Sequence, residues 1–111
     1  MITVAETTEY AKRAKKLLSE QERSDLITYL AAHPEAGDVM EGTGGVRKVR
    51  WAREGKGKSG GVRVIYFYHN EGMPLYLLTL YGKSEKENLS AGERNDLAKL
   101  VGLLVRVARK H

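Results

Sequence analysis

The stretch GTGGVRKVRWAREGKGKSGGVR, residues 42–63, decides the fold, because it holds two strand-like segments joined by a loop rich in glycine and lysine. The second segment continues as GVRVIYFYH, residues 61–69, and LYLLTLYGK follows as residues 75–83. This last segment is apolar on both faces, as a central strand is. Segments of this length between turn residues predict a sheet of at least three strands.

Alternation along the strands divides their side chains between the two faces of the sheet. Val46, Lys48 and Arg50 share one face, while Arg47, Val49 and Trp51 share the other. Arg63 falls on the same face of its strand as Ile65 and Phe67, which are apolar. Because a buried arginine without a partner is costly, we expect Arg63 at the edge of the core with its guanidinium in a cleft.

Helical periodicity surrounds the strands on both sides. Residues 6–33 read as a helical hairpin, with a capping box at residues 19–22 between its two helices and a stop at His33-Pro34. A second capping box at residues 90–93 begins the last helix. Residues 2–4 could form a short first strand. The order helix, helix, three strands, helix predicts an α+β fold.

The length and composition of the chain exclude several classes of protein. With 111 residues and 41% hydrophobic side chains, we expect one domain, 1–111, and a globular chain. The chain has no cysteine, so disulfides and thiolate metal sites are excluded, and we expect no metal or other cofactor. The start does not resemble a signal peptide and no apolar run approaches a membrane span, so the expected location is cytoplasmic.

Positive charge gathers where the glycines are. The net charge is +5, and between residues 42 and 63 the only acid is Glu54. Cations this dense repel one another unless phosphate neutralises them, so the cluster indicates a nucleic-acid partner. The basic members of residues 42–63 are Arg47, Lys48, Arg50, Arg53, Lys56, Lys58 and Arg63.

Other motifs have a structural interpretation as well as a functional one. Residues 42–45, GTGG, could form a phosphate nest, but a tight turn is favoured. Trp51 could stack on a base, but core packing is favoured. We expect His33 and His69 to be structural, and residues 54–61 to be a mobile functional loop that lets backbone approach a ligand.

The segments GDVMEGTGGVRKVRW, KGKSGGVRVIYFY and LLTLYGKSEKENLS together resemble the RelE-like toxins of bacterial type II toxin–antitoxin systems, most closely the HigB-like branch of the RelE/ParE superfamily. The resemblance covers most of the chain, from about Ala32 onward. It implies a small antiparallel β-sheet with an N-terminal helical hairpin and a C-terminal helix packed on it. It also implies cleavage of messenger RNA in the ribosomal A site, contact with ribosomal RNA, and a cognate antitoxin protein as partner.

The resemblance also assigns residues. Lys56 and Lys58 match the cationic loop of the family, Arg63 its strand arginine, and Lys83 the basic residue after the last strand; these four are the expected catalytic residues. Well-known members continue with an arginine and a later tyrosine, where this chain has Ser84 and about Ser90, so Tyr81 or Tyr66 would have to replace the tyrosine. The expected RNA-binding residues are Arg47, Lys48, Arg50, Arg53 and Tyr81.

The chemistry follows from RNA itself. In metal-independent cleavage the 2′-hydroxyl attacks the adjacent phosphorus, and the enzyme moves two protons and stabilises a dianionic phosphorane. No histidine lies in the basic cluster, but a lysine can act as base when neighbouring cations lower its pKa from about 10.4. We expect Lys56 or Lys58 as base, Arg63 as phosphate clamp, and Lys83 as acid or second clamp, with the lysine roles interchangeable.

Two other functions remain open from the sequence. One is a non-nuclease toxin of the ParE type, which inhibits DNA gyrase by binding it. The other is a plain nucleic-acid-binding module, in which each cation contributes a similar small step to affinity.

Overall fold

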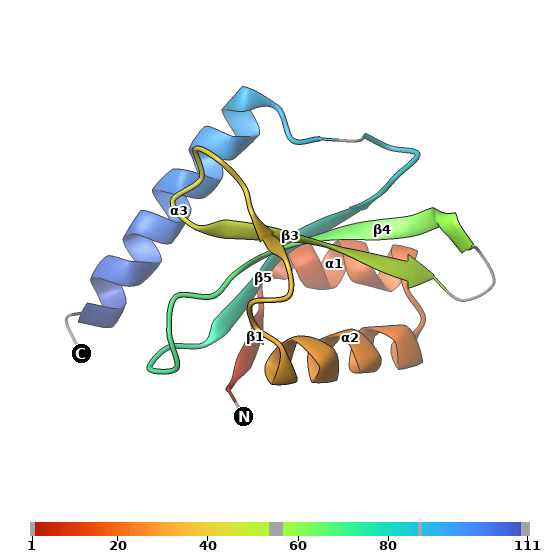
Figure 1. Ribbon diagram of the computed structural model, residues 1–111, viewed down its shortest axis with the longest axis horizontal. Coiled ribbons are helices and arrows are strands. Elements are labelled where there is room, and N and C mark those ends of the chain that lie inside the picture. Colours follow the sequence, from red (N-terminus) through yellow and green to blue (C-terminus); the bar gives the residue numbers. More distant parts are fainter. Residues whose placement is uncertain (1, 54–56, 87, 110–111) are drawn as a thin grey trace.

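The part of the chain that the structure describes forms a five-stranded sheet and three helices (Figure 1). The computed structural model describes residues 2–53, 57–86 and 88–109, and for residues 53 and 57–60 the backbone alone. The elements are β1 (Val4–Glu6), α1 (Thr8–Leu17), α2 (Glu20–Ala32), β2 (Asp38–Val39), β3 (Val46–Arg53), β4 (Gly57–Phe67), β5 (Leu75–Gly82) and α3 (Ala91–Arg109).

The sheet has the strand order β1-β5-β4-β3-β2. Strands β3, β4 and β5 are antiparallel neighbours, as the family resemblance implied, and β2 adds two antiparallel residues to the outer edge of β3. The short first strand exists, but it covers Val4–Glu6 and pairs parallel with Leu75–Leu77 of β5. The α+β prediction is therefore confirmed, with a sheet that is mostly rather than wholly antiparallel.

The predicted loop over residues 54–61 is wrong at its C-terminal end. Strand β4 begins at Gly57, whose Cα is paired with that of Arg53 across the hairpin. The glycines and the serine of residues 57–61 have low strand propensity, and this composition favoured a loop. Pairing with β3 overrides that local preference. Residues 54–56 lie outside the described residues.

Each helix begins at a side chain that satisfies its first backbone N–H groups. The hydroxyl of Thr7 accepts from the backbone N–H of Tyr10 at 3.2 Å. Both predicted capping boxes form: the Ser19 and Ser90 hydroxyls accept from the N–H groups of Glu22 and Glu93, and these glutamates accept from the serine N–H groups. Helix α2 ends at Ala32 with His33 as its C-cap, which confirms the predicted stop at His33-Pro34.

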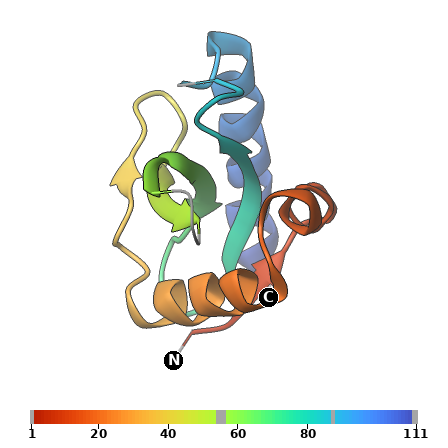
Figure 2. The ribbon, with the colours of Figure 1, turned by 90° about the vertical axis from the view of Figure 1, so that its right-hand side faces the viewer.

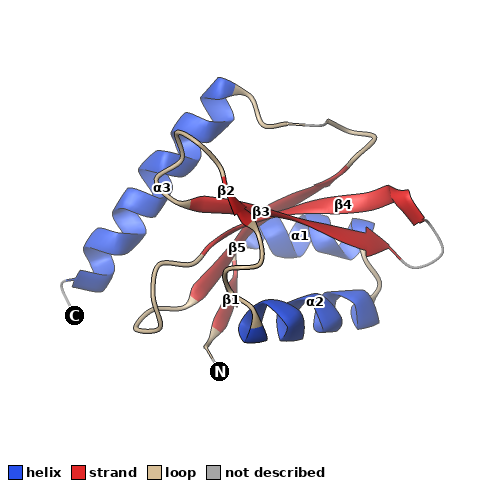
Figure 3. Ribbon diagram, viewed as in Figure 1, coloured by secondary structure: helices blue, strands red, loops and turns tan. Residues whose placement is uncertain are grey.

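The helices cover opposite faces of the sheet, so the molecule has three layers (Figure 2 and Figure 3). On one face, α1 and α2 pack through Tyr10, Ala14, Leu26 and Leu30 onto a core that includes Val62, Val64 and Tyr66. On the other face, Val101 of α3 packs in a core with Val46, Ile65 and Phe67. The alternation predicted for β3 and β4 thus matches the two cores.

Residues 42–45 form a tight turn that leads into β3. Gly42, Gly44 and Gly45 have φ of 77°, 76° and 111°, a region that favours glycine. The buried Thr43 hydroxyl donates to the Met40 carbonyl at 2.6 Å and accepts from the Val46 N–H at 3.0 Å. The glycines therefore serve the turn, which was the favoured interpretation.

None of the helices in the described residues is both long enough and apolar enough to cross a membrane.

Candidate active site

A row of three side chains crosses the sheet on the face that carries α3. The Cα of Arg63 is paired with that of Arg50 on one side and that of Tyr81 on the other, so β3, β4 and β5 each contribute one member. Arg63 is only 7% exposed and Tyr81 only 1%, whereas Arg50 is exposed. We call Arg50, Arg63 and Tyr81 the arginine row.

The two arginines of this row lie opposite each other, an arrangement that costs free energy. Like charges directly across an antiparallel pair are destabilising, and a nearly buried charge is more costly still. Within residues 2–53, 57–86 and 88–109, no carboxylate forms an ion pair with Arg50 or Arg63. The row is therefore suited to bind an anion, which would relieve the repulsion.

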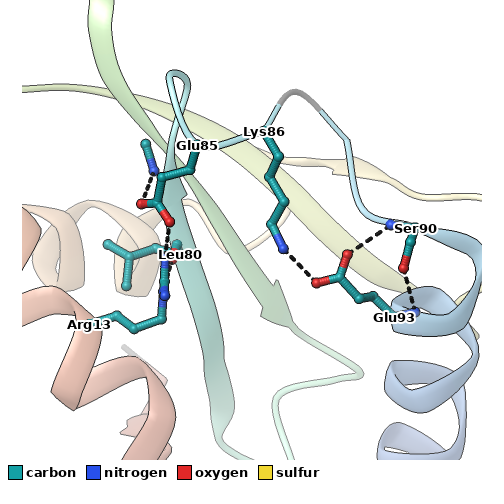
Figure 4. Close-up of polar contacts among 7 residues, drawn as sticks. Arg13, Leu80, Glu85, Lys86, Ser90 and Glu93 are labelled. Atoms are coloured by element: carbon teal, nitrogen blue, oxygen red, sulfur yellow. Dashed lines mark hydrogen bonds and ion pairs between the residues drawn. The ribbon is translucent and has the colours of Figure 1, made fainter.

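Tyr81, the third member of the row, belongs to the core that α3 covers. The Lys86 ammonium lies 5.2 Å from the centroid of the Tyr81 ring, and Lys86 donates to Glu93 at 2.5 Å (Figure 4). Burial raises the pKa of Tyr81, and the positive charge of Arg63 partly opposes that rise. With its ring covered, Tyr81 presents no open face for a base in this conformation.

Glu93 connects the loop that follows β5 to the start of α3. It accepts from Lys86 with one oxygen and from the Ser90 N–H with the other, at 2.9 Å (Figure 4). The bond from Lys86, with a smaller effect of Ser90, lowers the pKa of Glu93. The sequence indicated Glu93 only as a helix cap. Its bond to Lys86 spans seven residues across a loop, and no local pattern indicates such a contact.

One further cation, Lys48, lies on the same face as the row, and another, Lys83, follows the end of β5. The Cα of Lys48 is paired with that of Ile65, and the Lys48 ammonium donates to the Asn88 side chain at 3.4 Å. Lys83 is exposed and lies in the turn directly after β5, two residues beyond Tyr81. Its backbone N–H donates to the Gly61 carbonyl at 3.3 Å, which fixes its backbone beside β4. Asn88 is a contact that the sequence did not indicate.

The structure thus places four of the nine predicted site residues on one face of the sheet, Lys48, Arg50, Arg63 and Tyr81, and a fifth, Lys83, in the turn that follows β5 with its backbone bonded to β4. Lys56 lies outside the described residues, as do the side chains of Arg53 and Lys58.

Arg47 is on the opposite face and has a structural role. Its guanidinium donates to the carbonyls of Gly37 at 2.7 Å and Glu35 at 3.2 Å, so it ties the segment after α2 to β3. Tyr66 is also on that face and fully buried. Its hydroxyl accepts from the Gly37 N–H and donates to the Pro34 carbonyl. The suggestion that Tyr66 replaces a base-stacking tyrosine is wrong, because its ring lies in the core.

The histidines of the described chain are away from the row. His33 is the C-terminal cap of α2, with its ring 5.0 Å from that of Tyr29, and His69 stacks on Phe67 at 6.1 Å. Among residues 2–53, 57–86 and 88–109 there is no cluster of three or more His, Asp or Glu that could hold a metal ion.

The fold and the site define a small α+β protein in which two arginines lie opposite each other on the face of the sheet that carries α3. Residues 2–111 match the model of the family described as the RelE toxin of the RelE / RelB toxin-antitoxin system. The chain belongs to this family. It is therefore a toxin of a toxin–antitoxin system, and its partner is a cognate antitoxin.

Proposed function

We propose that this toxin is a ribosome-dependent endoribonuclease that cleaves messenger RNA in the A site and so inhibits translation. The observation that carries the proposal is the arginine row, in which a nearly buried Arg63 lies between Arg50 and Tyr81. A cation held in the sheet without a carboxylate partner among the described residues is suited to a phosphate that enters and leaves.

The reaction needs no group beyond the RNA and the protein. The 2′-oxygen forms a bond to phosphorus as it loses its proton to a base, and the bond from phosphorus to the 5′-oxygen breaks as an acid protonates that oxygen. The products are a 2′,3′-cyclic phosphate and a 5′-hydroxyl end. Two negative charges develop on the phosphorane, where preorganised cations lower the barrier most.

Arg63 is the phosphate clamp in this proposal. A guanidinium stays protonated and can donate two parallel hydrogen bonds to phosphate oxygens. Its backbone lies in the middle of the sheet between two strands, so it needs little reorganisation on binding. Lys56 or Lys58 would be the base and Lys83 the acid or second clamp, and these lysine roles are interchangeable.

The ribosome would position the message for the reaction. It holds the message extended in the A site, which converts an attack of low probability into one between positioned groups. Lys48 and Arg50 are on the same face as Arg63 and would hold RNA phosphates. Arg53 is a further candidate for this role from the sequence.

Primer extension on a reporter message in a purified translation system tests the proposal. Wild-type protein should give discrete cuts at codons occupied by ribosomes. Arg63→Ala should slow cutting by about 100- to 1000-fold, because it removes a transition-state donor. Arg63→Lys should fall between them, since it keeps the charge but loses the paired hydrogen bonds.

Arg23→Ala is the matched control. Arg23 forms an ion pair with Glu6 at 3.2 Å, on the opposite face from the row, so its loss should leave cutting unchanged. Growth inhibition by a wild-type protein that makes no cuts would contradict the nuclease proposal. A gyrase supercoiling assay would then test the ParE-type alternative. Equal small losses from every cation, with no cutting, would favour a plain nucleic-acid-binding module.

A further inference from the structure

The outer edge of β5 changes partner part-way along the strand. Strand β1 pairs with this edge only at Leu75–Leu77. Beyond Leu77, side chains of Thr7, which precedes α1, and of Arg13 in α1 contact the backbone carbonyls of β5. The Thr7 hydroxyl lies 2.9 Å from the Leu77 carbonyl and 3.0 Å from the Leu78 carbonyl. Arg13 Nε then donates to the Leu80 carbonyl at 2.6 Å. Arg13 therefore occupies the place of a strand neighbour at the end of β5.

The same arginine holds the turn that follows β5. Arg13 Nη2 donates to Glu85 Oε2 at 2.6 Å, and Glu85 Oε1 accepts from the Gly82 N–H at 3.1 Å (Figure 4). The Glu85 N–H in turn donates to the Gly82 carbonyl at 3.0 Å. Hydrogen bonds between Gly82 and Glu85 therefore close the 82–85 turn, and the bond from Arg13 to Glu85 attaches it to α1.

Lys83 lies inside this turn, and its backbone is fixed from both sides. On one side its N–H donates to the Gly61 carbonyl of β4 at 3.3 Å. On the other, Gly82 and Glu85 are held by Arg13 through the contacts above. The Lys83 side chain remains exposed. A flexible side chain on a fixed backbone reaches a restricted region, which is the condition for placing an ammonium group against a phosphate.

We propose that Arg13 and Glu85 are positioning residues, which hold the 82–85 turn against α1 and thereby determine where Lys83 enters the active site. This inference rests on the proposed nuclease function, in which Lys83 is the acid or second clamp. Neither Arg13 nor Glu85 touches the RNA in this role.

Stability alone does not account for the arrangement. Arg13 and Glu85 are 36% and 42% exposed in their side chains, and an ion pair this exposed contributes little to folding. Its specific feature is geometric, because one guanidinium bonds both a strand carbonyl and a carboxylate that closes the turn. A lysine at position 13 keeps the positive charge but lacks the planar, forked guanidinium. We therefore expect Arg13→Lys to lose this double contact.

Glu85 is equally specific. Its two oxygens accept from two different donors, Gly82 N–H and Arg13 Nη2. In Glu85→Gln, an NH₂ group takes the place of one of the two oxygens and cannot accept from the donor at that position. We therefore expect an intermediate effect from Glu85→Gln.

The first measurement is amide hydrogen exchange by NMR at Gly82 and Lys83. Both amides should exchange about 10-fold or more faster in Arg13→Lys than in the wild type, because the turn opens more often, and Glu85→Gln should lie between. Arg23→Lys, which weakens the ion pair between Arg23 of α2 and Glu6 of β1, should change neither amide. Unchanged exchange at both amides in Arg13→Lys would overturn the proposal.

The second measurement is the rate of message cutting as the concentration of ribosome complexes is varied. Arg13→Lys should lower kcat by about 10- to 100-fold with KM within about twofold, because a misplaced Lys83 affects the chemical step. Arg23→Lys should match the wild type in both constants. Unchanged kcat in Arg13→Lys, with faster amide exchange, would also overturn the positioning role. A wild type that cuts nothing would refute the nuclease function, and the exchange data would still show whether Arg13 and Glu85 hold the turn.

Discussion

Tyr10 and Tyr66 are both fully buried on the face that carries α1 and α2, but their hydroxyls differ. The Tyr66 hydroxyl accepts from the Gly37 N–H at 2.8 Å and donates to the Pro34 carbonyl at 2.9 Å. The Tyr10 hydroxyl has no hydrogen-bond partner among the described residues. A buried polar group without a partner costs free energy, whereas a satisfied one contributes modestly.

Replacing each tyrosine with phenylalanine should separate these cases. Tyr66→Phe leaves the Gly37 N–H without its acceptor and should lower the free energy of unfolding by about 1–3 kcal/mol. Tyr10→Phe removes a group that gains no bond and should leave stability unchanged or raise it slightly. Urea unfolding followed by circular dichroism measures both. A Tyr10→Phe protein less stable than Tyr66→Phe would contradict this reading of the core.

At the scale of elements, two glycines have opposite surroundings. A Cβ added to Gly37, next to β2, would lie 2.9 Å from the Lys48 carbonyl oxygen and 2.9 Å from Tyr66 Cε1. A Cβ added to Gly102, in the middle of α3, would meet nothing within 4 Å. Gly37→Ala should destabilise by about 1–3 kcal/mol through overpacking, and Gly102→Ala should stabilise by about 0.5–1 kcal/mol through helix propensity. Thermal unfolding checks both signs, and equal shifts would contradict the prediction.

The elements that the sequence predicted correctly carry their own local signals. The two capping boxes, the His33-Pro34 stop and the alternation in residues 62–68 each depend on neighbours in the chain. β1 and β2 depend on a partner instead: three residues of β1 are a strand because Leu75–Leu77 lies beside them, and two of β2 because β3 does. The start of β4 at Gly57 has the same origin.

The candidate site likewise combines features that a local pattern predicted with contacts that depend on the fold. Alternation alone assigned Lys48, Arg50 and Arg63 to particular faces, and these assignments are confirmed. The pairing of Arg50 with Arg63 and of Arg63 with Tyr81 requires the register between strands, which no short motif gives. Contacts such as Arg13 with Glu85 join residues 72 positions apart. Such contacts become visible only when the chain is folded.

For the whole molecule, titratable groups set two limits on stability. Burial raises the pKa of Tyr10, Tyr66 and Tyr81 above the ordinary value of 10.0. The Gly82 N–H first, and Arg13 second, lower the pKa of Glu85 below its ordinary value of 4.5, and Lys86 first does the same for Glu93. The tyrosines favour the folded state while neutral, and the glutamates do so while ionised.

The free energy of unfolding should therefore be highest between about pH 4.5 and pH 10 and fall on both sides. The tyrosine contribution is complete below about pH 10 and is lost as pH rises through the raised folded-state pKa values. The glutamate contribution is present above about pH 4.5 and is lost as pH falls through the lowered values. Urea unfolding from about pH 3 to pH 11 measures the profile. Because the tyrosines are buried and the glutamates exposed, the alkaline loss should be the larger. Tyr10→Phe should reduce the alkaline loss and leave the acid side unchanged, and a profile that Tyr10→Phe changes only below pH 7 would refute the assignment.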